Sequence, residues 1–295
     1  MRVTGAMQNM QLVNNLQRIN EGMTKAQNQL ATGQKITKPS DDPIGVGYQM
    51  RYDTDLARSD EFLNNAQTGS EILKTMDALM QQASDVMKRA RTLTLQAANG
   101  TYDAEQRKVI SAEIKQLKEQ LVTIGNSTYN GRYLFNGQKT DQAPYTVAGA
   151  AGESTDPGTF SLYVSPAVKV PVSLTGEDIF GKAGTDNAFK VLDDLATALD
   201  SNDTTAISAS LGKIDTVADG FSLGWAEIGA RMNRFELMEN RITSEQTNLK
   251  EMRANVADVD VPTVITDLKM KEVVLQSALS TGARIMQTSL LDFLR

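Results

Sequence analysis

The 295-residue sequence contains no cysteine and no histidine. Without them the chain can form no disulfide, no thiol nucleophile, no Ser-His-Asp triad and no zinc site with His or Cys ligands. Only carboxylate, lysine, tyrosine or serine chemistry is left, and no pair of carboxylates stands out against apolar neighbours. We therefore predict that the protein is not an enzyme and has no cofactor-binding, catalytic or metal site.

Aromatic residues, long apolar runs and basic clusters are also scarce. Aromatics make up 5% of a chain that is 40% hydrophobic, with a mean hydropathy of −0.32. This composition favours long helices that meet along narrow stripes over a compact α/β enzyme. No run of about 18 apolar residues predicts a membrane helix, and the N-terminus lacks the apolar core of a Sec signal. A net charge of −6 without dense Lys/Arg runs argues against nucleic-acid binding.

Apolar residues at alternating steps of three and four form a heptad seam near each end of the chain. Neither arm can easily bury its seam without the other, so we expect the two to lie side by side. A single helix of this length is marginal in water, so we also expect the arms to order when copies associate. The predicted assembly interface consists of Leu12, Leu16, Ile19, Met23, Leu30, Ile265, Leu268, Leu275, Leu279, Met286 and Phe293.

A break with turn and capping residues lies beside each arm, in "ATGQKITKPSDDPIG" (31–45) and "ADVDVP" (257–262). Glycine after a helix, proline beyond it, and Asp-Pro before the next helix are the usual stop and start signals. The paired acids could suggest a cation site, but neighbouring side chains at a helix start point in different directions. We therefore interpret them as caps. The predicted break and capping residues are Gly33, Pro39, Asp42, Pro43, Asp260 and Pro262.

Between the breaks, the helical period predicts a hairpin of two long helices that turns at Asn99-Gly100, and it resumes from about residue 187 to 256. Between 141 and 183 the period changes to strand-like alternation, with Pro171 marking an edge strand. The predicted fold is mainly α: a long antiparallel bundle or coiled coil of N- and C-terminal segments with a small central β insertion. The predicted domains are the terminal arms (1–40 and 258–295), a helical trunk (41–140 and 184–257) and the insertion (141–183).

Four stretches resemble a known family. "RARTLTLQAANGTYDAEQR" (89–107) is similar to the Arg-x-Arg…Gln-x-x-Asn-Gly stretch of bacterial flagellins. "QLATGQKITKPSDDPIG" (29–45), "STYNGRYLFNGQKT" (127–140) and "ALSTGARIMQTSLLDFLR" (278–295) resemble the hook-associated protein 3 family within the flagellin superfamily. The β insertion carries no signature of this family.

The resemblance implies a structural, non-enzymatic subunit of the bacterial flagellum at the hook–filament junction. The arms would line the tube, and the trunk would pack between neighbours. The implied partners are further copies in a ring or helical layer, hook-associated protein 1, flagellin, and an export chaperone that holds the C-terminal arm. Export through the flagellar type III channel would need no cleaved signal peptide and would place the protein outside the cell; neither nucleic acid nor membrane insertion is implied.

Other functions stay open at this point. Flagellin itself is the main alternative, although "SLLDFLR" and "KPSDDP" argue against it, and hook-associated protein 1 is normally much longer. A carboxylate-dependent hydrolase would need a pocket built from Asp41, Asp42, Asp258 and Asp260. An adhesin or secreted signalling protein would rest on the β insertion alone.

Overall fold

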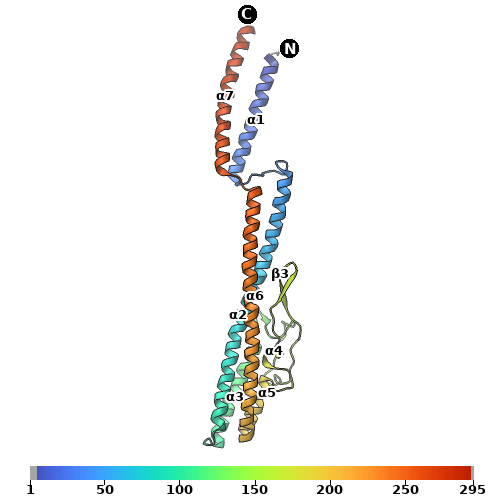
Figure 1. Cartoon of the computed structure of the whole chain (residues 1–295), viewed down its shortest axis with the longest axis vertical. Helices are drawn as coiled ribbons and strands as arrows, with labels where there is room; N and C mark the ends of the chain where they lie inside the picture. Colours follow the sequence, from blue (N-terminus) through green and yellow to red (C-terminus); the bar gives the residue numbers. More distant parts are fainter. Residues whose placement is uncertain (1–4, 294–295) are drawn as a thin grey trace. The chain divides into compact units, whose positions relative to one another are not determined.

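A computed structural model describes the backbone of residues 5–293 and the side chains of residue 7 and residues 9–284. It is mainly helical with two small two-stranded sheets in the middle of the chain, which confirms the predicted fold class (Figure 1). The helices are α1 (Gly5–Thr32), α2 (Pro43–Ala98), α3 (Ala104–Gly125), α4 (Gly176–Phe180), α5 (Ala188–Asp200), α6 (Thr204–Ala257) and α7 (Val261–Phe293). The strands are β1 (Thr128–Tyr129), β2 (Arg132–Tyr133), β3 (Ser161–Ser165) and β4 (Val168–Pro171).

The chain divides into two compact units. The first, the arm unit, contains the residues up to Arg58 and those from Glu245 onward; the second, the central unit, is Ser59–Ser244. Both breaks predicted from the sequence fall inside the arm unit. The predicted division into arms, trunk and insertion at residues 40, 141, 183 and 258 stays a prediction. None of the described helices combines the length and hydropathy needed to cross a membrane.

Helices α2 and α6 pack antiparallel in the central unit. Arg91 Nε lies 2.6 Å from Asp215 Oδ1. Further along, Gly69 lies so close to the Phe235 ring that a Cβ on Gly69 would be 2.5 Å from ring atom Cε1. Residue 91 of α2 contacts residue 215 of α6, whereas the earlier residue 69 contacts the later residue 235. The two helices therefore run antiparallel. The Phe235 ring is fully buried at this contact, so glycine is what permits the close approach of the two helices.

Helices α2 and α3 form the predicted hairpin. Its turn leads into a capping box: the Gln106 N–H donates to Asp103 Oδ1 at 2.8 Å, and the Asp103 N–H donates to Gln106 Oε1 at 3.1 Å. These reciprocal bonds satisfy backbone donors at the start of α3 that have no partner within the helix. The boundary of α3 is therefore set by local side-chain chemistry.

Five aromatic residues gather in the core of the central unit. Phe180 lies at the centre, with ring centroids 5.3–5.8 Å from those of four other rings. Burial in this cluster raises the pKa of the Tyr145 hydroxyl, so this residue stays neutral. Edge-to-face pairs add to the energy of area burial, which concentrates stability in one place. The rings around Phe180 are Phe135, Tyr145, Phe189 and Phe221.

The β elements differ in part from the prediction. β1 and β2 form a hairpin whose turn residues Asn130 and Gly131 have φ of +50° and +77°, as in a type I′ turn. β4 ends at Pro171, although the strand-like alternation of the sequence runs on beyond this residue. The short helix α4 then follows, capped at Thr175 by a box with Asp178. Sequence reasoning missed α4, although Thr-x-x-Asp is a start signal, because strand-like alternation runs up to it.

Candidate functional site

The two breaks meet each other in the arm unit. The Lys35 N–H donates to Ala257 O at 2.7 Å, and the Val259 N–H donates to Gly33 O at 3.1 Å. The segments 33–35 and 257–259 thereby form a short antiparallel bridge. Each break thus supplies hydrogen-bond partners to the other, and Ala257, whose carbonyl accepts one of these bonds, is fully buried. We call this pairing the joint.

Gly33 makes the joint possible. Its φ of +69° lies in the left-handed region that favours glycine, and its N–H donates to Gln29 O at 2.9 Å, which closes the end of α1. A Cβ at this position would meet nothing within 4 Å. The need for glycine is therefore a matter of backbone conformation alone. The Gln29 side chain also donates to Lys35 O at 2.7 Å, which connects the last turn of α1 to the bridge.

Asp41 holds the loop after α1. It accepts hydrogen bonds from Lys25 Nζ at 2.9 Å, the Thr37 hydroxyl at 3.0 Å and the Lys38 N–H at 3.1 Å. The hydrogen bond from Lys25, followed by that from Thr37, lowers the pKa of Asp41 to about 2. Pro39 lies inside the turn that this carboxylate closes. The side chain is committed to the loop, and the residues that the structure describes contain no cluster of three carboxylates suited to a metal.

Asp42 and Pro43 begin α2. Asp42 Oδ1 accepts a hydrogen bond from the Gly45 N–H at 2.9 Å, which is the geometry of an N-cap, and Pro43 is the first helical residue. A Cβ on Gly45 would lie 2.7 Å from Ile36 Cδ1. Ile36 is buried beside this cap, so the loop covers the start of α2 with an apolar side chain.

Asp260 stands in the same position before α7. Its backbone oxygen accepts from the Val264 N–H at 3.0 Å, and its carboxylate accepts from the Thr263 hydroxyl. Pro262 lies in the first turn of α7, where no intrahelical donor is required. Both long helices that leave the joint therefore start with an aspartate and a proline.

The arms α1 and α7 lie side by side and run antiparallel, with their far ends at the same side of the arm unit, as expected from the sequence (Figure 1). Gly22 packs on the Lys271 side chain, where a Cβ would be 3.2 Å from Cε. Gly282 packs on Leu12, where a Cβ would be 2.7 Å from Cδ2. Glycine at two contacts allows the helices to approach closely.

The α1–α7 contact buries only part of the predicted seam. Ile265 and Leu279 remain 47% and 55% exposed, while Lys271 and Gly282 face α1. The side chains of Met286 and Phe293 lie outside the described residues. Contacts with further copies stay a prediction for the whole seam. The half-buried seam residues are Leu12, Leu16, Ile19, Met23, Leu30, Leu268 and Leu275.

Each arm also exposes large apolar side chains on other faces. On α7, Val273 is 63% exposed and lies one turn from Met270 and beside Val274, which are also exposed. At 100° per residue Val273 is on the opposite side of the helix from Lys271 and Gly282, and Met270 and Val274 lie between these two sides. Contiguous exposed apolar surface marks an interaction site in soluble proteins. The corresponding exposed residues of α1 are Met7, Met10 and Val13.

The stretch 89–107 that resembles flagellins has a structural role in the central unit. Arg107 is buried and donates to Ala97 O at 2.9 Å, to Asn99 O at 3.4 Å and to the Asn202 side chain. One guanidinium therefore joins the α2–α3 turn to the α5–α6 turn. The local sequence pattern indicates no role for Arg107, because its partner Asn202 is distant in the chain.

Two family models match the chain: the bacterial flagellin N-terminal helical region at residues 3–140 and the bacterial flagellin C-terminal helical region at residues 211–294. The chain is 25% identical over 274 residues to a flagellin of Listeria innocua, covering 92% of this chain and 91% of that protein. It is 24% identical over 291 residues to flagellar hook-associated protein 3 of Salmonella typhimurium, covering 90% and 91%.

Solved structures share the fold. The flagellar hook-associated protein-3 of Legionella pneumophila aligns with a TM-score of 0.63 and 14% identity, over 70% of this chain and 98% of that one. FlgL of Bacillus cereus aligns with a TM-score of 0.60 and 20% identity, over 69% and 99%. At these identities the likeness establishes the fold alone.

Proposed function

We propose, on the premise that this chain belongs to the bacterial flagellin superfamily, that it is the subunit between the hook and the filament. Flagellin-family chains are structural components of the extracellular flagellum, so this protein is a building block and not an enzyme. The finer proposal is that it adapts the hook-associated protein 1 zone to the flagellin filament. It would do so as a layer of identical copies.

The observation that carries an assembly function is the pair of arms with its open apolar faces. The arms α1 and α7 are held together at the joint by the backbone bonds of Lys35 and Val259, yet Val273 and its neighbours stay uncovered. Such surface is costly in water and stabilises the packing of further helices against it. Neighbouring copies that lay their arms together would bury it.

Two motifs favour a function as the hook–filament junction subunit over a function as the filament subunit. The "KPSDDP" break (38–43) and the closing "SLLDFLR" (289–295) resemble the hook-associated protein 3 family. Asp41 closes the loop after α1 and Asp42 caps α2, so this motif has a physical role in the arm unit. Relatives named hook-associated protein 3 cover about nine-tenths of the chain.

Flagellin itself is the second candidate. Relatives named flagellin match over the same length and with similar identity. The two candidates share the arms, the joint and the helical hairpin, and differ in which subunits they touch. On either function, the partners would include further copies, and export would proceed unfolded through the flagellar type III channel after a chaperone has held the C-terminal arm.

Deletion of the gene in its host, followed by electron microscopy of the cell surface and an immunoblot of the medium for flagellin, tests the proposal. We expect bare hooks together with flagellin in the medium, because filament protein would be made without a layer to receive it. Loss of the filament protein with no flagellin in the medium would identify this chain as flagellin. Intact, motile flagella would contradict both functions.

Complementation of the deletion with matched variants tests the apolar arm surface. Val273→Glu puts a charge on the exposed face of α7, whereas Gln276→Glu puts the same charge on an exposed position of the same helix that is already polar. We expect Gln276→Glu to restore filaments and Val273→Glu to fail at normal protein levels. Equal restoration by both variants would show that this face is not an interface.

A further inference from the structure

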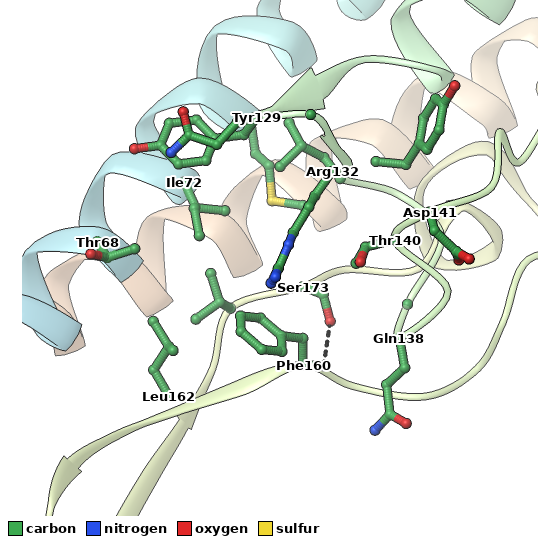
Figure 2. Close-up of a pocket in the computed structure, with 17 residues that line it drawn as sticks. Thr68, Ile72, Tyr129, Arg132, Gln138, Thr140, Asp141, Phe160, Leu162 and Ser173 are labelled. Carbon is green, nitrogen blue, oxygen red and sulfur yellow. Dashed lines mark hydrogen bonds between the residues drawn. The ribbon is translucent and has the colours of Figure 1, made fainter.

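A pocket of about 860 Å³ opens in the central unit (Figure 2). Helix α2 forms one wall with Thr68, Ile72 and Met76, and the β1–β2 hairpin and the segments around β3 and β4 form the others. This volume lies in the range of small-molecule sites, about 300–1,000 Å³. All the residues that line it belong to the central unit, and none to the arms.

Arg132 extends into this pocket from β2. In Figure 2 its side chain runs between Ile72 and Ser173 and ends above the Phe160 ring. Its backbone position is fixed because Arg132 pairs with Tyr129 across the hairpin. Among the described residues, no hydrogen bond or ion pair reaches the Arg132 side chain, which distinguishes it from Arg91, Arg107 and others that are bound to acids or carbonyls.

Two polar groups of the pocket lining are already bonded. Ser173 Oγ accepts from the Phe160 N–H at 2.8 Å (dashed in Figure 2), and the Tyr129 hydroxyl donates to Glu71 at 2.7 Å. The apolar lining consists of Ile72, Met76, Leu134, Phe160, Leu162 and Val172.

Asp141 is the other charged residue of the lining. It lies beyond Thr140 from Arg132 in Figure 2. Its charge would repel an anion at that end of the pocket, so an anion is directed to Arg132. A planar guanidinium beside apolar surface suits a carboxylate, which it can bind through two parallel hydrogen bonds.

We propose that this pocket binds a small organic carboxylate with an aromatic or branched aliphatic body. The carboxylate pairs with the Arg132 guanidinium, and the body lies against Ile72, Phe160 and Leu162. Both halves of the ligand are required, because an exposed ion pair alone is weak and the apolar wall alone does not select for charge.

The test is an NMR titration of the full chain with 4-phenylbutanoate and with its uncharged analogue 4-phenylbutanamide, followed through the arginine Nε–H signals. We expect the carboxylate to bind at least tenfold more tightly than the amide and to shift the Arg132 signal. Arg132→Gln should remove that tenfold preference, while Arg58→Gln, an exposed arginine of α2 outside the pocket, should retain it.

A second variant separates loss of the site from loss of folding. Thr68→Trp fills the pocket from an exposed helix position and should weaken both ligands at least tenfold, with the other arginine signals unchanged. Equal affinity for the two ligands, no shift of the Arg132 signal, or binding unaffected by Arg132→Gln and Thr68→Trp would each overturn the proposal. None of these outcomes bears on filament assembly, so the two proposals can fail separately.

Discussion

Replacement of Gly33 by alanine should loosen the joint without changing any packed contact. The added Cβ would meet nothing within 4 Å, so its only effect is on the backbone, which has a φ of +69°. Holding a residue with a Cβ in the left-handed region costs roughly 1–2 kcal/mol more than holding glycine there. That cost should appear as an equilibrium constant for local opening that is about 5–30 times larger.

Amide hydrogen exchange of Lys35 and Val259 measures this opening, because both N–H groups donate across the bridge, to Ala257 O and Gly33 O. We expect their exchange to accelerate by about 5–30-fold in Gly33→Ala. Gly33→Asn should show a smaller rise, since asparagine tolerates the left-handed region better than other side chains.

Gly184→Ala is the matched control. Gly184 has a φ of +72° and also has nothing within 4 Å of its Cβ position, but it lies in the central unit, where its N–H donates to Ala151 O. The same backbone strain there should leave exchange of Lys35 and Val259 unchanged. If Gly33→Ala leaves their exchange within twofold of the wild type, or if Gly184→Ala accelerates it equally, the assignment of Gly33 to the joint is wrong.

Three further outcomes can be checked by standard measurements. Gly69→Val would push a side chain into the buried Phe235 ring and should lower the free energy of unfolding, measured in urea, by about 1–3 kcal/mol. Gly220→Ala is the control: it adds a Cβ in open space within α6 and should raise the free energy of unfolding by about 0.5–1 kcal/mol. Asp193→Ala removes the ion-pair partner of Lys118, whose side chain is 11% exposed, and should lower the free energy of unfolding by about 1–3 kcal/mol. Asp215→Ala removes the partner of Arg91, whose side chain is 46% exposed, and should lower it by at most about 1 kcal/mol. Similar losses in the two variants would contradict this ranking. The pKa of Asp41 falls from 3.8 to about 2 on folding, so its contribution is complete above pH 4 and is lost as the pH falls towards 2; exchange at Lys38 should accelerate in that window for the wild type and show no such dependence in Asp41→Asn.

Local signals in the sequence determined most helix boundaries. The turn at Asn99-Gly100, the start of α3, the end of α1 at Gly33 and the Asp42-Pro43 start of α2 all follow from residues within four positions of each other. Capping and left-handed glycine depend on neighbours in the chain, so a pattern of residues predicts them directly. The absence of cysteine and histidine likewise excluded whole classes of site without any structure.

Contacts between distant residues could not be predicted in the same way. The 3.6-residue turn of a straight helix drifts by about 20° per heptad, so a heptad pattern does not determine which side of the predicted α7 seam is covered. In the structure Lys271 and Gly282 lie on the side of α7 that packs against α1, whereas Ile265 and Leu279 remain exposed.

The joint, the role of Arg107 and the pocket around Arg132 have the same origin in tertiary structure. The Lys35–Ala257 bond, the Arg107–Asn202 contact and the approach of Phe160 to Arg132 each join segments that are far apart in the chain. Sequence therefore decided where each helix begins and ends and what chemistry the chain lacks. Only the folded structure decided which faces meet and which stay open, because that choice depends on the shape and burial of partners that no local pattern contains.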